Sequence, residues 1–166
     1  MSRIAKPVLI RRWRDNPPSP LTGRDEPPRE RDQQRKRLYA AETILASVSR
    51  RRIETVPDLQ AYVDELCHKP WFKHRWGSHQ VVVKDGRGRR RASAIGNVIK
   101  MPRHARFEWV VLHEVAHTLT PAPLAWHGSY FANVYMELIR FRLGTAIADK
   151  LESYFRIHRV RHTPRC

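Results

Sequence analysis

Two histidines four residues apart, with a glutamate directly after the first, are the residues of this sequence best suited to chemistry: His113-Glu114-Val115-Ala116-His117. Residues i and i+4 share one face of a helix, so both imidazoles can bind one metal ion. Glu114 then lies beside the position that water occupies in a catalytic zinc site, where a carboxylate can act as general base. The pentapeptide therefore predicts zinc-dependent hydrolysis, with one Zn²⁺ per chain as cofactor.

The residues around the pentapeptide favour a helix with an apolar back. The segment from Arg106 to Leu112 contains neither glycine nor proline, and Pro102 and Pro121 supply limits on either side. A helix continued through the segment places apolar side chains on the side away from the histidines. These side chains are Val111, Leu112, Val115 and Leu119.

A catalytic zinc site needs a third protein ligand, and the candidates are His127 and Glu137. The extended metzincin pattern is excluded, because it requires glycine and histidine where this chain has Thr120 and Pro123. Glu137 has a thermolysin-like spacing, but it lies about 110 to 120 degrees from the apolar stripe of a helix expected over residues 129–142. His127 projects close to that stripe. We therefore prefer His127 as ligand and interpret Glu137 as a solvated or supporting carboxylate, with the thermolysin-like site as the alternative.

The order of these motifs resembles that of known metallohydrolases. Val110 to His117, followed by His127-Gly128-Ser129-Tyr130-Phe131, is similar to the HExxH and HGxxF motifs of SprT-like zinc metallopeptidases. Upstream, Arg31-Asp32-Gln33-Gln34-Arg35 and Leu38-Tyr39-Ala40-Ala41-Glu42 resemble more closely a family of small HExxH metallohydrolases found in actinobacteria and their phages. The resemblance covers roughly residues 29 to 160.

The resemblance implies a zinc ion bound by His113, His117 and His127, with Glu114 as catalytic base. It implies no substrate, because that family is named from its motif. Amide hydrolysis also needs a hydrogen-bond donor for the oxyanion besides the metal. Tyr130, three residues after His127, is the candidate for this catalytic role.

Basic residues outnumber acidic ones, 32 to 16, which gives a formal net charge of +16 and favours phosphate-rich partners. The excess is concentrated in residues 1 to 52 and in the segment Lys84-Asp-Gly-Arg-Gly-Arg-Arg-Arg91. Residues 79–84 and 91–95 have the pattern of two strands of a hairpin, which would place Arg87 to Arg91 in an exposed turn. This turn and the basic N-terminal arm could bind nucleic acid. The turn could equally be a solvated loop that keeps the protein soluble.

The chain divides into an arm, one domain and a tail. Residues 1–28 hold six of the twelve prolines among charged residues, which predicts a flexible basic arm. Residues 29–160 are expected to form a zincin-like metallohydrolase domain, and 161–166 a C-terminal tail. We predict an α+β fold in which a small three-stranded sheet packs with helices that include the metal-binding helix. Helices are expected over 29–49, 57–68, 129–142 and 145–157, and a third strand over 97–101. Val98 and Ile99 of that strand are expected to line the substrate path.

No segment reaches the roughly 20 apolar residues that cross a bilayer, and the N-terminus lacks the apolar run of a secretory signal. Cys67 and Cys166 form no CxxC motif and suggest no disulfide, and Cys67 is expected in the core. We therefore expect no membrane association and a cytoplasmic location, in the host cytoplasm if a phage encodes the chain.

Three functions fit these observations. The first is a zinc metallopeptidase that cleaves amide bonds in a peptide or protein substrate. The second is a DNA-associated SprT-like protease, although two cysteines cannot form the four-cysteine zinc ribbon expected of one. The third is a non-catalytic basic nucleic-acid-binding protein.

Overall fold

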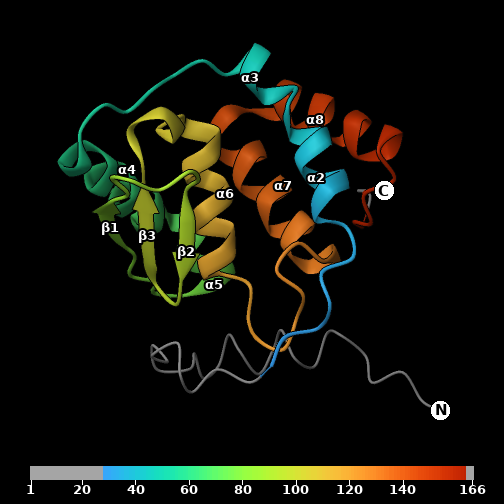
Figure 1. Ribbon diagram of the computed structural model, residues 1–166, viewed down its shortest axis with the longest axis horizontal. Coiled ribbons are helices and arrows are strands. Elements are labelled where there is room, and N and C mark those ends of the chain that lie inside the picture. Colours follow the sequence, from blue (N-terminus) through green and yellow to red (C-terminus); the bar gives the residue numbers. More distant parts are fainter. Residues whose placement is uncertain (1–27, 164–166) are drawn as a thin grey trace.

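The computed structural model describes residues 28–163, which form a small three-stranded sheet at one side of the molecule and helices that pack against it and against one another (Figure 1). This arrangement agrees with the predicted α+β class. All but the last residue of the predicted arm, and residues 164–166 of the predicted tail, lie outside the described residues.

The first helical region is shorter than predicted and is interrupted. Instead of one helix over 29–49, the structure has α2 (Arg35–Glu42) and α3 (Leu45–Val48). The Asp32 carboxylate accepts a hydrogen bond from the Arg35 backbone N–H at 3.1 Å, as a capping side chain does, so the helix begins here. Around Thr43 the backbone hydrogen bonds tighten to the i to i−3 pattern, which separates the two helices. Of the apolar residues at helical spacing in this region, Leu38, Ala41 and Leu45 are fully buried and Ile44 and Val48 are half-buried.

The next two helices carry core residues, and the first of them agrees with the helix predicted over 57–68. α4 (Val56–His68) begins at Thr55, whose hydroxyl accepts a hydrogen bond from the Asp58 backbone N–H. α5 (Pro70–Trp76) places two of its aromatic rings in the core. Burial also raises the pKa of the Cys67 thiol to about 12, so this residue is an inert core side chain. The buried apolar residues of these helices are Leu59, Tyr62, Val63, Leu66, Phe72 and Trp76.

The strands pair in a different order from the one predicted. The sheet has the order β1 (Val82–Asp85), β3 (Val98–Met101), β2 (Ser93–Ile95). β3 is parallel to β1 and antiparallel to β2, so the predicted hairpin between the first two strands is wrong. The hairpin instead joins β2 to β3 through Gly96 and Asn97. Gly96 has φ 56° in the first position of this two-residue turn, a position that glycine tolerates well.

The central place of β3 changes the expected substrate path. Because β3 is paired on both sides, its backbone cannot pair with an extended peptide, and Ile99 is fully buried. β3 therefore cannot take up a peptide as a neighbouring strand and Ile99 cannot line a substrate path, while the same role for the half-buried Val98 stays a prediction. The sheet edge that lies against α6 (Glu108–Thr118) belongs to β2.

The base of the arginine-rich loop between β1 and β2 is held firmly. The Gly86 backbone N–H donates to the Met101 carbonyl at 3.2 Å, and a Cβ at Gly86 would lie 2.5 Å from the Pro102 nitrogen. Only glycine allows so close an approach. The buried Arg106 donates to the Met101 carbonyl and, at 3.1 Å, to the Asp85 carboxylate.

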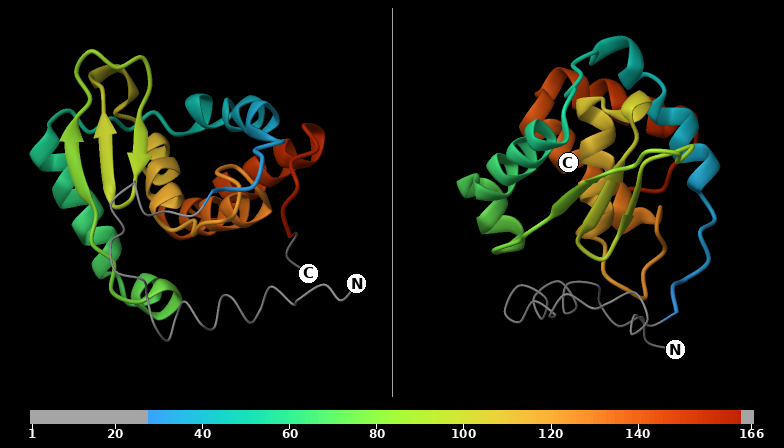
Figure 2. Two further views of the ribbon diagram at one scale, coloured as in Figure 1. Left: turned by 60° about the horizontal axis from the view of Figure 1, so that its bottom comes forward. Right: turned by 60° about the vertical axis from the view of Figure 1, so that its left-hand side comes forward.

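The remaining helices build the part of the molecule that carries the pentapeptide. α6 follows the short 3₁₀ helix η1 (Arg103–Ala105) and lies between the sheet and α7 (Ser129–Leu143), as Figure 2 shows. α7 packs on α8 (Thr145–Ile157), and α2 packs across α8. Gly144, with φ 97°, separates α7 from α8 as predicted. None of the helices between residues 28 and 163 is long and apolar enough to span a membrane.

Candidate metal centre

Three histidines converge between α6 and the start of α7. One ring nitrogen from each of His113, His117 and His127 lies within 4.8 Å of the other two. The Nε2 atoms of His113 and His117 are 3.1 Å apart. This distance is close to the about 3.3 Å that separates two imidazole nitrogens bound to one tetrahedral zinc ion. The three residues are 4, 9 and 5 % exposed. These histidines are therefore close enough to bind a metal ion.

His113, His117 and His127 form what we call the histidine cluster. Two carboxylates orient two of its three rings. Glu42 Oε2 lies 2.8 Å from His113 Nδ1, and Asp32 Oδ2 lies 2.6 Å from His127 Nδ1. Because an ionised carboxylate can only accept, each Nδ1 donates to it, and in the neutral imidazole the Nε2 lone pair is directed at the cluster. His127 Nε2 is buried without a hydrogen-bond partner among the described residues, which fits a nitrogen that binds a metal ion.

Sequence reasoning did not find the roles of Asp32 and Glu42. Glu42 is 71 residues from its histidine, and Asp32 is 95 residues from its own, so no local spacing links them. One signal was present, because Glu42 lies four residues after Leu38 on the apolar stripe of its helix. A carboxylate on a core-facing stripe needs a buried partner.

These contacts predict that Glu42→Gln and Asp32→Asn each raise the dissociation constant for Zn²⁺ by about 10- to 100-fold. Either amide loses the charge that makes the histidine a stronger ligand, and it can turn its NH₂ group toward the ring. Competition with a chromogenic chelator measures the change. Glu54→Gln is the matched control, since it removes a carboxylate from an exposed ion pair with Arg52. Unchanged zinc affinity in both site variants would contradict the orienting role.

The Glu114 carboxylate is buried beside the histidine cluster. It is 5 % exposed, and its Oε2 atom has no hydrogen-bond partner among the described residues. Burial raises the pKa of Glu114 to about 7, with the charge of His113 opposing this rise and that of Glu42 adding to it. Near neutral pH the side chain can therefore both accept and release a proton, as a general base must.

The protonation states of the three imidazoles differ. Burial lowers the pKa of His117 well below its ordinary value and that of His127 to about 4, and the positive charge of His113 adds to both effects. Burial also disfavours the charged form of His113, but the carboxylates of Glu42 and Glu114 outweigh it and raise its pKa. Neutral imidazole is the form that binds metal ions. The surroundings therefore favour the neutral form at His117 and His127 and the charged form at His113.

Aromatic rings pack around the cluster. The centroid of the Phe131 ring lies between 4.5 and 5.1 Å from the three histidine ring centroids. The Trp126 ring meets His117 edge-on at 5.4 Å, and the Arg29 guanidinium lies 3.4 Å from the Trp126 ring centroid. These contacts limit the rotation of the histidine rings and keep solvent from their sides.

Residues 29–32 cross the loop that precedes the third ligand. Arg29 donates to the carbonyls of Thr120 and Leu124, both at 3.1 Å, and the backbone N–H of Glu30 donates to the Pro123 carbonyl at 2.7 Å. Asp32, the last residue of this segment, orients the His127 ring. The start of the described chain thus holds the loop and its histidine in one position.

Glu137 and Tyr130, which the sequence analysis also singled out, lie at an ion pair separate from the histidine cluster. Glu137 accepts hydrogen bonds from Arg75 at 2.9 and 3.2 Å, so its carboxylate is directed toward α5. Burial raises the pKa of Tyr130, while the charges of Arg75 and Glu137 act on it in opposite directions. Within residues 28–163, no hydrogen bond or ring contact joins Tyr130 to the histidine cluster. The structure brings His127, not Glu137, to the cluster, and the catalytic role of Tyr130 stays a prediction.

Comparisons with known proteins add nothing to this geometry. No protein-family model matches the chain, and searches of curated proteins and of solved structures give no match either. Inference about function therefore depends on the site itself.

Proposed function

We propose that the protein is a zinc-dependent hydrolase with a zincin-like fold, a metallopeptidase that cleaves amide bonds in peptides or proteins. One observation carries the proposal: three buried histidine nitrogens converge beside the buried carboxylate of Glu114, which has no hydrogen-bond partner among the described residues. The metal-bearing helix lies along the sheet edge at β2, an arrangement that supports the zincin-like fold.

The residues present fit a zinc ion. His113, His117 and His127 would hold it, since three imidazole nitrogens are a common zinc donor set and leave one position open. When bound, the ion supplies an acidified water and polarises a carbonyl oxygen. Glu114 takes the proton from the attacking water and returns it to the leaving amine nitrogen. Glu42 and Asp32 keep two of the ligand rings oriented.

The first test is the metal content and activity of the wild-type protein. After purification with zinc and removal of free metal, elemental analysis is expected to give about one zinc per chain. The loaded protein is expected to cleave members of a quenched-fluorescence peptide library, and a chelator should stop the cleavage. A chain that folds normally and never retains stoichiometric zinc would falsify the proposal.

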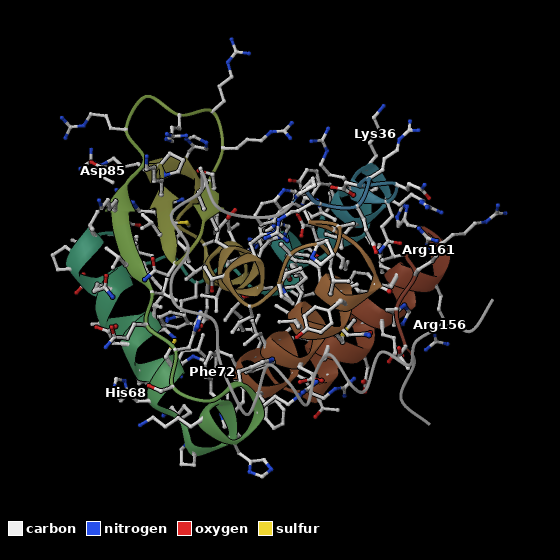
Figure 3. All side chains as sticks on the ribbon, turned by 90° about the horizontal axis from the view of Figure 1, so that it is seen from below. Lys36, His68, Phe72, Asp85, Arg156 and Arg161 are labelled. Carbon is white, nitrogen blue, oxygen red and sulfur yellow. The ribbon has the colours of Figure 1, made fainter. Side chains whose placement is uncertain are left out.

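A second candidate function, a protease associated with DNA, is favoured by the arginine-rich loop. Arg89, Arg90 and Arg91 are exposed and make no ion pair within the part of the chain that the structure describes. In Figure 3 the loop beyond Asp85 projects on the same side of the molecule as Lys36, another exposed cation. Unpaired, exposed cations of this kind bind phosphate groups.

This candidate predicts that duplex DNA stimulates peptide cleavage and that binding weakens steeply with salt. The combined Arg89→Ala and Arg90→Ala variant should lower the slope of log affinity against log salt by roughly 1 to 2. Fluorescence anisotropy with labelled DNA measures it, and Arg156→Ala on α8 is the matched control. DNA binding that persists without zinc, in a protein that cleaves nothing, would instead indicate the non-catalytic nucleic-acid-binding protein.

A further inference from the structure

Two tyrosines contact the rings of the histidine cluster, and their hydroxyl groups differ. The Tyr135 ring lies 5.3 Å from His113, but its side chain is fully buried and its hydroxyl donates to the Trp109 carbonyl at 3.2 Å. The Tyr39 ring lies 5.7 Å from His113 and 5.1 Å from His127. Within residues 28–163 the Tyr39 hydroxyl makes no hydrogen bond, and it is not among the buried unpartnered atoms, so solvent reaches it. Of the two, only Tyr39 can offer its O–H to a substrate.

Charged groups of both signs surround Tyr39. The Arg91 guanidinium carbon lies 5.7 Å from the centroid of its ring. Burial and the carboxylates of Glu42 and Glu114 raise the pKa of the phenol, and the charges of Arg91 and Arg35 oppose that rise. Arg91 comes from the loop before β2, whereas Tyr39 comes from α2. The phenol therefore stays protonated as a hydrogen-bond donor, and the charges of Arg91 and Arg35 would favour a negative charge that develops next to it, against those of the two carboxylates.

We propose that Tyr39 is a catalytic residue, the hydrogen-bond donor to the carbonyl oxygen of the scissile amide, and that Arg91 is a positioning residue that acts through it. The inference deepens the proposed hydrolase function and rests on it. As water adds to the amide carbon, the carbonyl oxygen becomes negatively charged. The Tyr39 O–H donates a hydrogen bond to that oxygen and keeps its own proton, so no bond to tyrosine forms or breaks. This is the role that the sequence assigned to Tyr130.

The test is Tyr39→Phe, which removes the donor and keeps the ring that contacts the histidines. We expect kcat to fall by about 100- to 1,000-fold, with KM within a few-fold of wild type and the zinc content unchanged. A second readout does not depend on turnover. Calorimetric titration of the zinc-loaded protein with a phosphinic pseudo-tripeptide, a tetrahedral analogue of the hydrolysing amide, should show affinity weakened by about 10-fold or more.

Matched variants separate the donor from its surroundings. Tyr154→Phe, on α8, is expected to behave like wild type. Arg91→Ala should lower kcat by about 10-fold, and Arg91→Lys should restore most of it, because the positive charge returns. A purely structural role for Arg91 would not distinguish lysine from alanine in this way.

Each other outcome overturns a specific statement. Wild-type kcat and phosphinic affinity in Tyr39→Phe overturn the donor role, as does a loss found in Tyr130→Phe instead. Loss of zinc from Tyr39→Phe would show that the tyrosine only supports the ligands. A wild-type protein that binds zinc but neither cleaves peptides nor binds the phosphinic probe overturns the proposed function, and this assignment with it. If wild type does both and Tyr39→Phe equals it, the assignment alone fails.

Discussion

Glutamine in place of Glu114 is expected to abolish hydrolysis while zinc stays bound. The amide keeps the size of the side chain but cannot accept a proton from water, so kcat should fall by about 100- to 10,000-fold. The zinc content should stay at about one per chain, because the three histidines and their carboxylate partners are untouched. Peptide cleavage and elemental analysis on the same preparation measure both quantities.

The stability of the same variant shows whether a loss of activity comes from misfolding. Glu114 Oε2 is buried without a partner among the described residues, so a neutral amide avoids burial of a charge. We therefore expect the melting temperature of the metal-free Glu114→Gln protein to equal that of wild type or exceed it. Glu65→Gln, at an exposed ion pair with Lys69, is the control for losing a carboxylate elsewhere. Retained turnover in Glu114→Gln would rule out this residue as the base.

The second large effect is expected from removal of His127, the proposed third ligand, which should weaken zinc binding. His127→Ala leaves only two imidazoles at the site. The dissociation constant for zinc should therefore rise further than it does when a supporting carboxylate is lost, a loss that costs about 10- to 100-fold. In wild type, free zinc at about 100 times its dissociation constant should stabilise the fold by about 2.7 kcal/mol. His127→Ala should lose this stabilisation, which thermal melts with and without zinc measure.

Glu137→Gln is the matched variant for this experiment. Its carboxylate is bound to Arg75, so we expect it to retain stoichiometric zinc and the full rise in melting temperature. The reverse pattern, with zinc lost from Glu137→Gln and kept by His127→Ala, would establish the thermolysin-like alternative.

Helical periodicity predicted how the three histidines project. It placed His113 and His117 on one helix and favoured His127 over Glu137, because His127, in the turn before α7, projects toward the apolar face of that helix. The structure brings the three histidines together and leaves Glu137 with Arg75. The face of a single helix was enough to predict the pairing of His113 with His117 and to choose His127 over Glu137.

Features that depend on distant segments could not be predicted in this way. The periodic residues of 29–49 were located correctly, but the start of the helix depends on Asp32, whose other oxygen binds His127. Strand pairing was wrong because alternation of apolar residues does not say which strand is the neighbour. The glycine and asparagine between β2 and β3 were a stronger hairpin signal than the arginine-rich loop.

The contact between Asp32 and His127 also bears on the order in which the parts of the molecule fold. It closes a separation of 95 residues, whereas the two histidines of α6 are placed by a single helical turn. Bringing such distant segments together costs more chain entropy than closing one helical turn, so we expect the Asp32–His127 contact to form after α6. A partly folded chain would therefore carry His113 and His117 on α6 without His127 held in place, so the complete histidine cluster would mark completion of the tertiary structure.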